Sequence, residues 1–307
     1  GHEEVIRRAM SNSDHLLVII GSSNIAATVK NPFTGGQRRT MISDFLWKSE
    51  DIPNKNYTLV NVGDYPYSDS TWMGEIHRVV SLQCDDILRK TGQLPTVKLV
   101  GSDRDDSTWY LSAFPRWQLD LIDPFPEGGN MNATELRHRL FARELAAEEV
   151  NETTFPELSE HVRAYIRGWM ATSTSYANLV AEEKCIRDYK ERWASAPYAP
   201  TFITADAVVI QSGHLLVVER GQRPGKGLYA LPGGFVNQKE RVRDAAVREL
   251  IEETGLKVPE AVLKGSIRAT ETFDHPDRSL RGRTVTYASL IMLDDTKPLP
   301  RVKGQNV

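Results

Sequence analysis

Short apolar runs alternate with amphipathic stretches along the first half of the chain. Residues 16–20 (LLVII), 57–62 and 97–100 are apolar enough to be buried strands, and the first and third of these runs each end at a glycine. Apolar residues recur at helical spacing in four further stretches, 37–46, 72–90, 133–148 and 158–193. Buried strands that alternate with helices predict an α/β domain built on a parallel sheet.

The pattern changes near residue 195. Segment 195–200 (SAPYAP) contains two prolines, which discourage continuation of a helix, and the residues that follow are rich in β formers. We therefore predict a first domain over residues 1–194, including the long helical stretch at its end, and a second domain over residues 195–307.

The second domain begins with two β-rich runs, 205–210 and 214–219, whose Gln-Ser-Gly connection predicts a hairpin. A glycine-rich loop and a helix follow, and 284–293 predicts a later strand. Because this domain is short for an α/β domain, we expect it to be truncated at its C-terminus. Residues 3–10 predict a helix with no strand before it, although a doubly wound pattern calls for a strand there.

Composition and charge narrow the class of protein. The chain is 40% hydrophobic and 26% charged, which is typical of a globular protein, and its net charge of −3 provides no overall positive field for nucleic acid. The apolar runs are far shorter than the ~20 residues that span a bilayer. The two cysteines, Cys84 and Cys185, exclude a disulfide framework. We expect a cytoplasmic protein without nucleic-acid or membrane partners; a homo-oligomer is among the states that the sequence allows.

Three glutamates of the second domain lie on one side of a predicted helix. Glu249, Glu252 and Glu253 fall within an arc of about 100° that overlaps the apolar stripe containing Val242 and Leu250. Like charges at this spacing repel one another, and a divalent cation would neutralise them. Oxygen ligands without His or Cys favour Mg²⁺, with Mn²⁺ as a substitute. The alternative is a solvated acidic helix face.

These glutamates belong to a longer pattern, G-x5-E-x7-R-E-U-x-E-E-x-G-U, which runs from Gly234 to Leu256. The pattern resembles the Nudix box without a departure. The resemblance implies a Nudix α/β/α domain with an ion pair between Arg248 and Glu240. It also implies catalysis of diphosphate hydrolysis by a metal that polarises the diphosphate and activates water. The metal ligands implied by the resemblance are the Gly233 carbonyl and the side chains of Glu249, Glu252 and Glu253.

Arginines cluster in the loop 274–284 (DHPDRSLRGRT), before the last predicted strand. The guanidinium groups of Arg278, Arg281 and Arg283 are suited to hold phosphate or a terminal ribose, and a charged surface loop is the alternative. The phrase F-D-x-P-x-R-S-x-R-G-R-T is similar to the loop of ADP-ribose pyrophosphatases that are fused to adenylyltransferases. This similarity implies ADP-ribose as the substrate.

Two segments of the first domain resemble phosphate motifs of nucleotidyltransferases. Segment 131–137 (MNATELR) is similar to I-S-x-T-x-x-R, with Asn132 at the usual serine, and implies that Thr134 caps a helix whose amides bind triphosphate together with Arg137. Gly1-His2 resembles the end of H-x-G-H, with the strand before it missing from the chain, and implies that His2 contacts phosphate. The alternatives are an ordinary helix cap and a cloning-tag remnant.

Further segments as far as Phe141 are similar to nicotinamide-mononucleotide (NMN) adenylyltransferases, which have a Rossmann-like parallel sheet. Trp72 would stack on the nicotinamide ring, and packing in the core is its alternative. The nucleotide-binding residues implied by this resemblance are Asn31, Arg38, Trp72, Gly101, Arg104, Asp105 and Thr134.

The order of the two domains resembles that of bifunctional bacterial enzymes of NAD metabolism. It implies adenylyl transfer from ATP to NMN, or to its deamidated form, giving NAD and pyrophosphate, with His2 and Arg137 stabilising the growing charge. It also implies Mg-dependent hydrolysis of ADP-ribose to AMP and ribose 5-phosphate. Two alternatives remain, a Nudix hydrolase on an inactive nucleotidyltransferase-like scaffold and a ligand-sensing Nudix regulator without hydrolysis.

Overall fold

The computed structural model describes residues 2–50, 52, 56–102, 106–122, 133–300 and 302. The chain divides into two compact units, Gly1–Val180 and Ala181–Val307. This division falls inside helix α6 (Ser175–Glu191), which contributes its first residues to one unit and its last residues to the other. The domain boundary between residues 194 and 195 stays a prediction.

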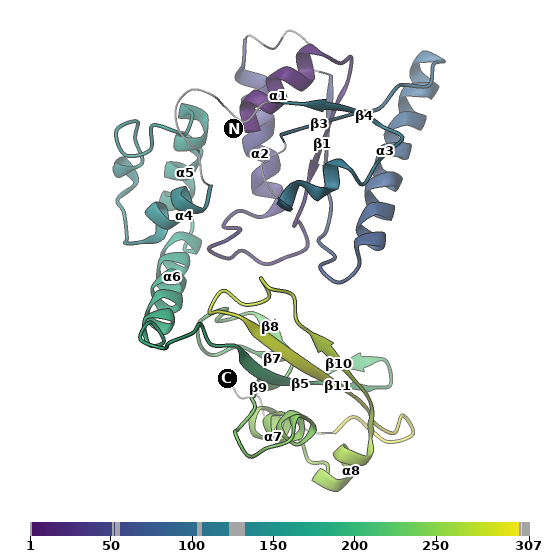
Figure 1. Cartoon of the computed structure of the whole chain (residues 1–307), viewed down its shortest axis with the longest axis vertical. Helices are drawn as coiled ribbons and strands as arrows, with labels where there is room; N and C mark the ends of the chain where they lie inside the picture. The colour runs from purple at the N-terminus through teal and green to yellow at the C-terminus, as the bar shows by residue number, and fades with distance from the viewer. Residues whose placement is uncertain are drawn as a thin grey trace. The chain divides into compact units, whose positions relative to one another are not determined.

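The first unit combines a parallel α/β part with a helical part (Figure 1). Its strands are β1 (Leu16–Ile20), β2 (Tyr57–Asn61), β3 (Lys98–Gly101) and β4 (Gln118–Leu121). Its α-helices are α1 (His2–Ser11), α2 (Gly35–Lys48), α3 (Asp69–Thr91), α4 (Ala133–Phe141), α5 (Glu160–Thr172) and the start of α6, with 3-10 turns at Asp106–Leu111 and Ala147–Glu149. The three predicted strands are confirmed. Strand β4 escaped prediction because its sequence, Gln-Leu-Asp-Leu, alternates polar and apolar residues and does not form an apolar run.

Strand β1 is covered on both faces, which explains its continuous apolar sequence. Val18 and Ile20 pack in a cluster with residues of α1 and α2, whereas Leu17 and Ile19 pack in a second cluster with residues of α3. Strand β2 pairs with β1 in parallel, from Leu16 opposite Tyr57 onward. This arrangement confirms the α/β class of the first unit.

Strands β3 and β4 form a second parallel pair. Among the described residues the two pairs are not joined into one sheet, and β1 and β3 line the same cavity. The strand expected before α1 stays a prediction.

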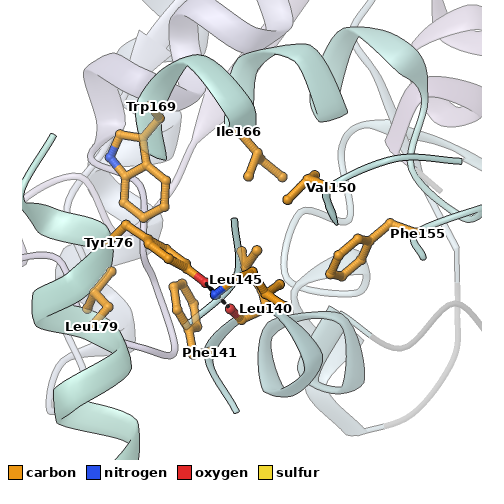
Figure 2. Close-up of a cluster of buried hydrophobic side chains, with 9 residues drawn as sticks. All are labelled: Leu140, Phe141, Leu145, Val150, Phe155, Ile166, Trp169, Tyr176 and Leu179. Atoms are coloured by element: carbon orange, nitrogen blue, oxygen red, sulfur yellow. Dashed lines mark hydrogen bonds between the residues drawn. The ribbon is translucent and has the colours of Figure 1, made fainter. Parts of the chain in front are cut away.

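Helices α4, α5 and α6 enclose a separate apolar cluster (Figure 2). The hydroxyl of Tyr176 accepts a hydrogen bond from the Leu145 amide at 2.8 Å and donates one to the Leu140 carbonyl at 3.1 Å. A continuous helix would need both of these backbone groups, so α4 ends at Phe141 and the prediction of a helix over 133–148 is wrong beyond that point.

The predicted helix over 158–193 is likewise two helices. Ser173 and Thr174 separate α5 from α6, and hydroxyl side chains compete for backbone groups, which favours a break in the helix. None of the described helices is both long and apolar enough to cross a membrane.

The second unit contains a mixed sheet in the order β10-β11-β5-β6, with β9 also paired to β5. Only β11 and β5 are parallel in this sheet, and α7 packs against both of them (Figure 1). The strands of the whole second unit are β5 (Phe202–Gln211), β6 (His214–Leu215), β7 (Val218–Glu219), β8 (Tyr229–Ala230), β9 (Gly233–Phe235), β10 (Ile267–Phe273) and β11 (Thr284–Met292). The unit also contains the complete helices α7 (Val242–Thr254) and α8 (Glu260–Gly265).

The hairpin predicted at the start of this unit is confirmed. Gln211 pairs with His214, and Ser212 and Gly213 between them adopt φ values of 49° and 74°, as a two-residue turn of the I′ class requires. The run 214–219 does not form one strand, because Val218 and Glu219 pair instead with β8.

The Tyr176 hydroxyl provides a test of the helical cluster. The change Tyr176→Phe keeps the ring but leaves the buried Leu145 amide without its acceptor. We therefore expect the free energy of unfolding to fall by about 1–3 kcal/mol. Denaturant unfolding followed by circular dichroism measures this loss. Tyr198→Phe is the matched control because the Tyr198 side chain is 85% exposed. Equal stability of the two variants would contradict this account of how α4 ends.

Candidate functional site

Helix α7 brings the predicted glutamates to the sheet of the second unit. Ala245, Ala246 and Leu250 are fully buried, with α7 packed on β5. Gly255 ends the helix in the left-handed conformation, at φ 59°, which glycine adopts without strain. The strip of α7 next to this buried face carries Glu249 and Glu253.

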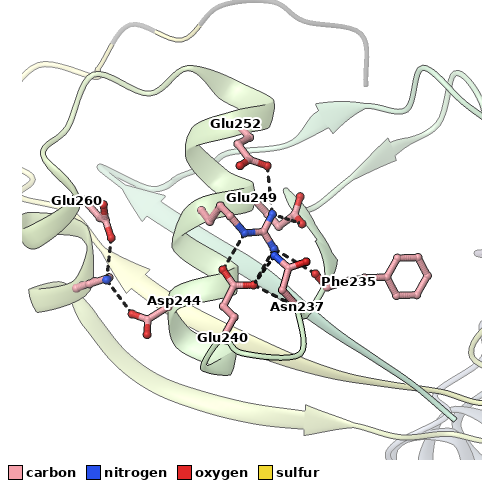
Figure 3. A network of polar contacts seen from close by, with 9 residues as sticks. Phe235, Asn237, Glu240, Asp244, Glu249, Glu252 and Glu260 are labelled. Carbon is pink, nitrogen blue, oxygen red and sulfur yellow. Dashed lines mark hydrogen bonds and ion pairs between the residues drawn. The ribbon is translucent and has the colours of Figure 1, made fainter.

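Arg248 is the centre of a polar network on α7 (Figure 3). Its Nε and Nη2 atoms donate to the two carboxylate oxygens of Glu240 at 2.8 and 2.9 Å, and Nη2 also donates to the Phe235 carbonyl. The hydrogen bonds from Arg248 hold the pKa of Glu240 at about 2. The predicted ion pair between Arg248 and Glu240 is therefore confirmed.

Arg248 also contacts two of the three glutamates that were predicted to bind metal. Its Nη1 atom donates to Glu249 at 2.7 Å and to Glu252 at 3.1 Å. The Glu249 carboxylate lies directly against Gly234, where a Cβ atom would come within 2.5 Å of Oε1. Position 234 therefore has room only for glycine while Glu249 keeps this place.

Glu253 contacts the backbone of β9. Its Oε2 atom accepts a hydrogen bond from the Gly233 amide at 3.0 Å. Burial raises the pKa of Glu253, and the charges of Glu249 and Asp206 act in the same direction. Glu253, Glu249 and Asp206 are thus close enough to repel one another.

Asp206 is a site residue that the sequence did not reveal. It lies on β5 opposite Gly233, and burial raises its pKa. Arg278 donates to Asp206 at 3.2 Å through Nη2 and to the buried Thr286 hydroxyl at 2.9 Å through Nε. The available signal was a single carboxylate within the apolar run 205–210, which by itself does not identify a partner.

The atoms near α7 that could bind a metal ion suit a hard divalent cation. All of them are oxygen atoms, and the two buried carboxyl groups, Asp206 and Glu253, have raised pKa values that a cation would lower. Among the described residues, no group of three acidic, His or Cys side chains is already arranged to hold a metal ion. Arg248 donates to one carboxylate oxygen of each of Glu249 and Glu252, so a cation could bind the other oxygen of each.

The three arginines of the loop before β11 do not converge. Arg278 faces Asp206, but the guanidinium of Arg281 lies over the rings of Tyr189 and Phe235, at 5.4 Å from each centroid. Arg283 donates to the Asp274 carbonyl. Arg278 is therefore the loop arginine that the structure brings to the carboxylates.

Six of the predicted residues of the first unit line one cavity of about 2370 Å³, and Thr134 does not. The predicted residues that line it are His2, Asn31, Arg38, Trp72, Gly101 and Arg137. Arg104 and Asp105 lie outside the described residues. Their assignment to nucleotide binding stays a prediction.

Two buried polar atoms beside this cavity have no hydrogen-bond partner among the described residues. They are Nε of Arg38 and the hydroxyl of Ser102, and both residues line the cavity. Arg38 donates through Nη2 to the Ser22 carbonyl at 3.2 Å, and burial lowers its pKa. Donors left unpaired in this way fit a ligand with several acceptor oxygens.

Thr134 and Arg137 contact each other. Helix α4 includes Ala133, so Thr134 lies in its first turn, and the prediction that Thr134 caps the helix is wrong. Instead its hydroxyl accepts a hydrogen bond from Nη2 of Arg137 at 3.1 Å. Arg137 is partly buried, and this burial lowers its pKa.

Trp72 packs among other aromatic side chains. Its ring centroid lies 5.5 Å from that of Trp109 and 6.0 Å from that of Phe114. It is partly buried in the cluster on the α3 side of β1 and also lines the cavity. The structure therefore confirms the core role, and stacking on the nicotinamide ring stays a prediction.

Comparison with known proteins extends over nearly the whole chain. A NUDIX domain model matches residues 200–305. A crystal structure of a bifunctional NMN adenylyltransferase/ADP ribose pyrophosphatase from Francisella tularensis, complexed with AMP and a Mn ion, is 31% identical, with a TM-score of 0.83. The match covers 99% of this chain and 84% of that one. The chain belongs to this bifunctional family. The Rossmann-like and Nudix fold predictions are thereby confirmed.

Each half of this bifunctional family member also matches single proteins. The nicotinamide/nicotinic acid mononucleotide adenylyltransferase of Acinetobacter baylyi is 27% identical over 157 residues, which are 51% of this chain and 73% of that protein. The ADP-ribose pyrophosphatase of Methanocaldococcus jannaschii is 29% identical over 116 residues, or 38% of this chain and 62% of that protein.

The lowered pKa of Glu240 predicts a pH-dependent contribution to stability. The Glu240–Arg248 pair stabilises the folded protein above the ordinary carboxyl pKa near 4.5, and this stabilisation is lost as the pH falls through about 2. We expect the stability difference between the wild type and Glu240→Gln to shrink as the pH falls from 5 towards 3. Urea unfolding at several pH values measures it, and a difference that does not vary with pH would contradict the assignment.

Proposed function

We propose that this protein makes NAD from ATP and NMN in its first unit and hydrolyses ADP-ribose to AMP and ribose 5-phosphate in its second. The observation that carries the proposal is the similarity to the Francisella enzyme across both units, at 99% coverage of this chain. We further propose a cytoplasmic location, because these phosphorylated nucleotides are made and consumed inside the cell.

In the second unit the proposed substrate is a nucleoside diphosphate sugar. We propose that Glu249, Glu252, Glu253 and the Gly233 carbonyl hold Mg²⁺, for which Mn²⁺ can substitute. When bound, such an ion polarises a phosphate and lowers the pKa of a water molecule. The guanidinium of Arg278 would bind the diphosphate while its Nη2 atom stays hydrogen-bonded to Asp206.

Replacing Glu253 tests the hydrolase half of the proposal. Glu253→Gln keeps the size of the side chain but removes a ligand charge, so we expect ADP-ribose turnover at saturating Mg²⁺ to fall at least about tenfold. Glu260→Gln on α8 is the control, because Glu260 is exposed and pairs with Lys264. Full turnover by Glu253→Gln would remove Glu253 from the metal site. A wild type that prefers 8-oxo-dGTP would contradict the proposed substrate.

In the first unit the phosphate of NMN would attack the α-phosphorus of ATP and release pyrophosphate. His2 and Arg137 line the cavity and would stabilise the negative charge that grows on the triphosphate. The reaction needs no covalent intermediate, so the main tasks of the unit are to orient the two nucleotides and to neutralise their charge.

Replacing Arg137 separates the two activities. Arg137→Ala should weaken the transition-state contact by about 2–4 kcal/mol, a roughly thirty- to thousandfold loss of NAD synthesis. ADP-ribose hydrolysis measured on the same preparation should barely change, because the second unit has its own site. Arg89→Ala is the control, with the Arg89 side chain 76% exposed.

Three results would count against this half of the proposal. Unimpaired NAD synthesis in Arg137→Ala would remove Arg137 from the active site. Equal loss of both activities would contradict two separate sites. A wild type that hydrolyses ADP-ribose but makes no NAD would favour an inactive scaffold.

A further inference from the structure

The C-terminal part of α6, from residue 181 to residue 191, contacts two loops of the second unit. We call residues 220–228 the Arg220 loop and residues 278–283 the Arg278 loop. The positive charges of Arg220 and Arg278 both act on the carboxyl group of Asp206, where they oppose the effect of burial on its pKa. Arg220 acts on Glu253 in the same way. The Arg278 loop therefore carries the arginine that contacts Asp206, and the Arg220 loop carries a second positive charge that acts on the same carboxyl groups.

Glu182 of α6 holds the Arg220 loop. Both of its carboxylate oxygens lie within hydrogen-bond distance of the Gly225 amide, at 2.9 and 3.0 Å, and Nε of Arg223 lies 3.9 Å from Oε1. The Glu182 side chain is only 15% exposed, so its carboxylate depends on the hydrogen bonds from the loop in place of water.

The contact at Gly225 is transmitted to Arg220 by the loop itself. Nε of Arg220 donates to the Pro224 carbonyl at 2.9 Å, directly before Gly225. The Arg220 backbone closes the loop through bonds with Gly227 at 2.7 Å and with Leu228 at 2.9 Å. A shift of Gly225 would therefore move the acceptor that orients the Arg220 side chain.

Tyr189, about two turns further along α6, holds the Arg278 loop. The Arg281 guanidinium lies over the rings of Tyr189 and Phe235, and burial lowers the pKa of Arg281. Tyr189 also packs edge-on against Phe202 at the start of β5, with 5.5 Å between the centroids. This cation–π contact fixes the loop three residues from Arg278.

We propose that Glu182 and Tyr189 are positioning residues of the hydrolase site, which hold the Arg220 loop in place and fix Arg278 beside Asp206 to receive a diphosphate. Both lie outside the region 200–305 that matches the NUDIX domain model. Fixing long arginine side chains before binding lowers the entropy lost when substrate binds. The inference rests on the proposed ADP-ribose hydrolysis, and it adds Arg220 to the groups that bind the diphosphate.

The kinetic test uses the full chain. We expect Glu182→Ala and Tyr189→Leu each to raise KM for ADP-ribose about tenfold, with the Mg²⁺ concentration for half-maximal activity unchanged because α7 is untouched. Glu182→Gln keeps an acceptor and Tyr189→Phe keeps the ring, so both should retain most of the affinity. Glu191→Ala and Tyr198→Leu are controls at exposed positions on and after the same helix.

Hydrogen exchange reports the contacts without depending on the substrate. The Gly225 amide should lose protection in Glu182→Ala and keep it in Glu182→Gln, and peptides that cover the Arg278 loop should exchange faster in Tyr189→Leu. If the wild type fails to hydrolyse ADP-ribose, the proposed function is wrong, and exchange still decides whether α6 holds the two loops.

Three results would overturn the inference. One is KM for ADP-ribose within twofold of the wild type in both Glu182→Ala and Tyr189→Leu. Another is unchanged exchange of both loops in these variants. A rise in the Mg²⁺ requirement equal to the rise in KM would also contradict it, because that pattern indicates general damage to the site.

Discussion

The burial of several carboxylates at one end of α7 is the constraint on which the second unit depends. Asp206 and Glu253 both have raised pKa values because β5, β9 and α7 remove them from water. Neighbouring arginines offset part of the free-energy cost of burying these charges. On α7 this arginine is Arg248, which donates a hydrogen bond to Glu249. A site with this excess of negative charge favours the binding of a divalent cation, which in turn can bind the phosphates of a substrate.

The first unit solves the opposite problem, because its ligands are anions. Its cavity is lined by Arg38 and Arg137, whose pKa values burial lowers, and by the Ser102 hydroxyl, which has no hydrogen-bond partner within the described part of the chain. Donors that are already desolvated gain more from a phosphate than donors in water. The two units thus share nucleotide substrates but neutralise charge in different ways, which agrees with separate activities in one chain.

Local patterns predicted much of this molecule from its sequence. The apolar run of β1 and the spacing of the glutamates on α7 could be recognised from the sequence, because each pattern involves only residues that are close together along the chain. Asp206 and Glu182 escaped prediction because their roles depend on partners far along the chain, Gly233 and Arg278 for one and Gly225 for the other. The end of α4 was missed for the same reason.

Direct Mn²⁺ binding tests the central claim that the carboxylates of α7 form a cation site. Electron paramagnetic resonance of free Mn²⁺, titrated with the full-length protein at neutral pH, counts bound ions without any substrate. The account predicts binding by the wild type that is lost or greatly weakened when Glu249 and Glu253 are both changed to Gln, with the fold intact by circular dichroism. Mn²⁺ binding of equal strength and number in that double variant would contradict it.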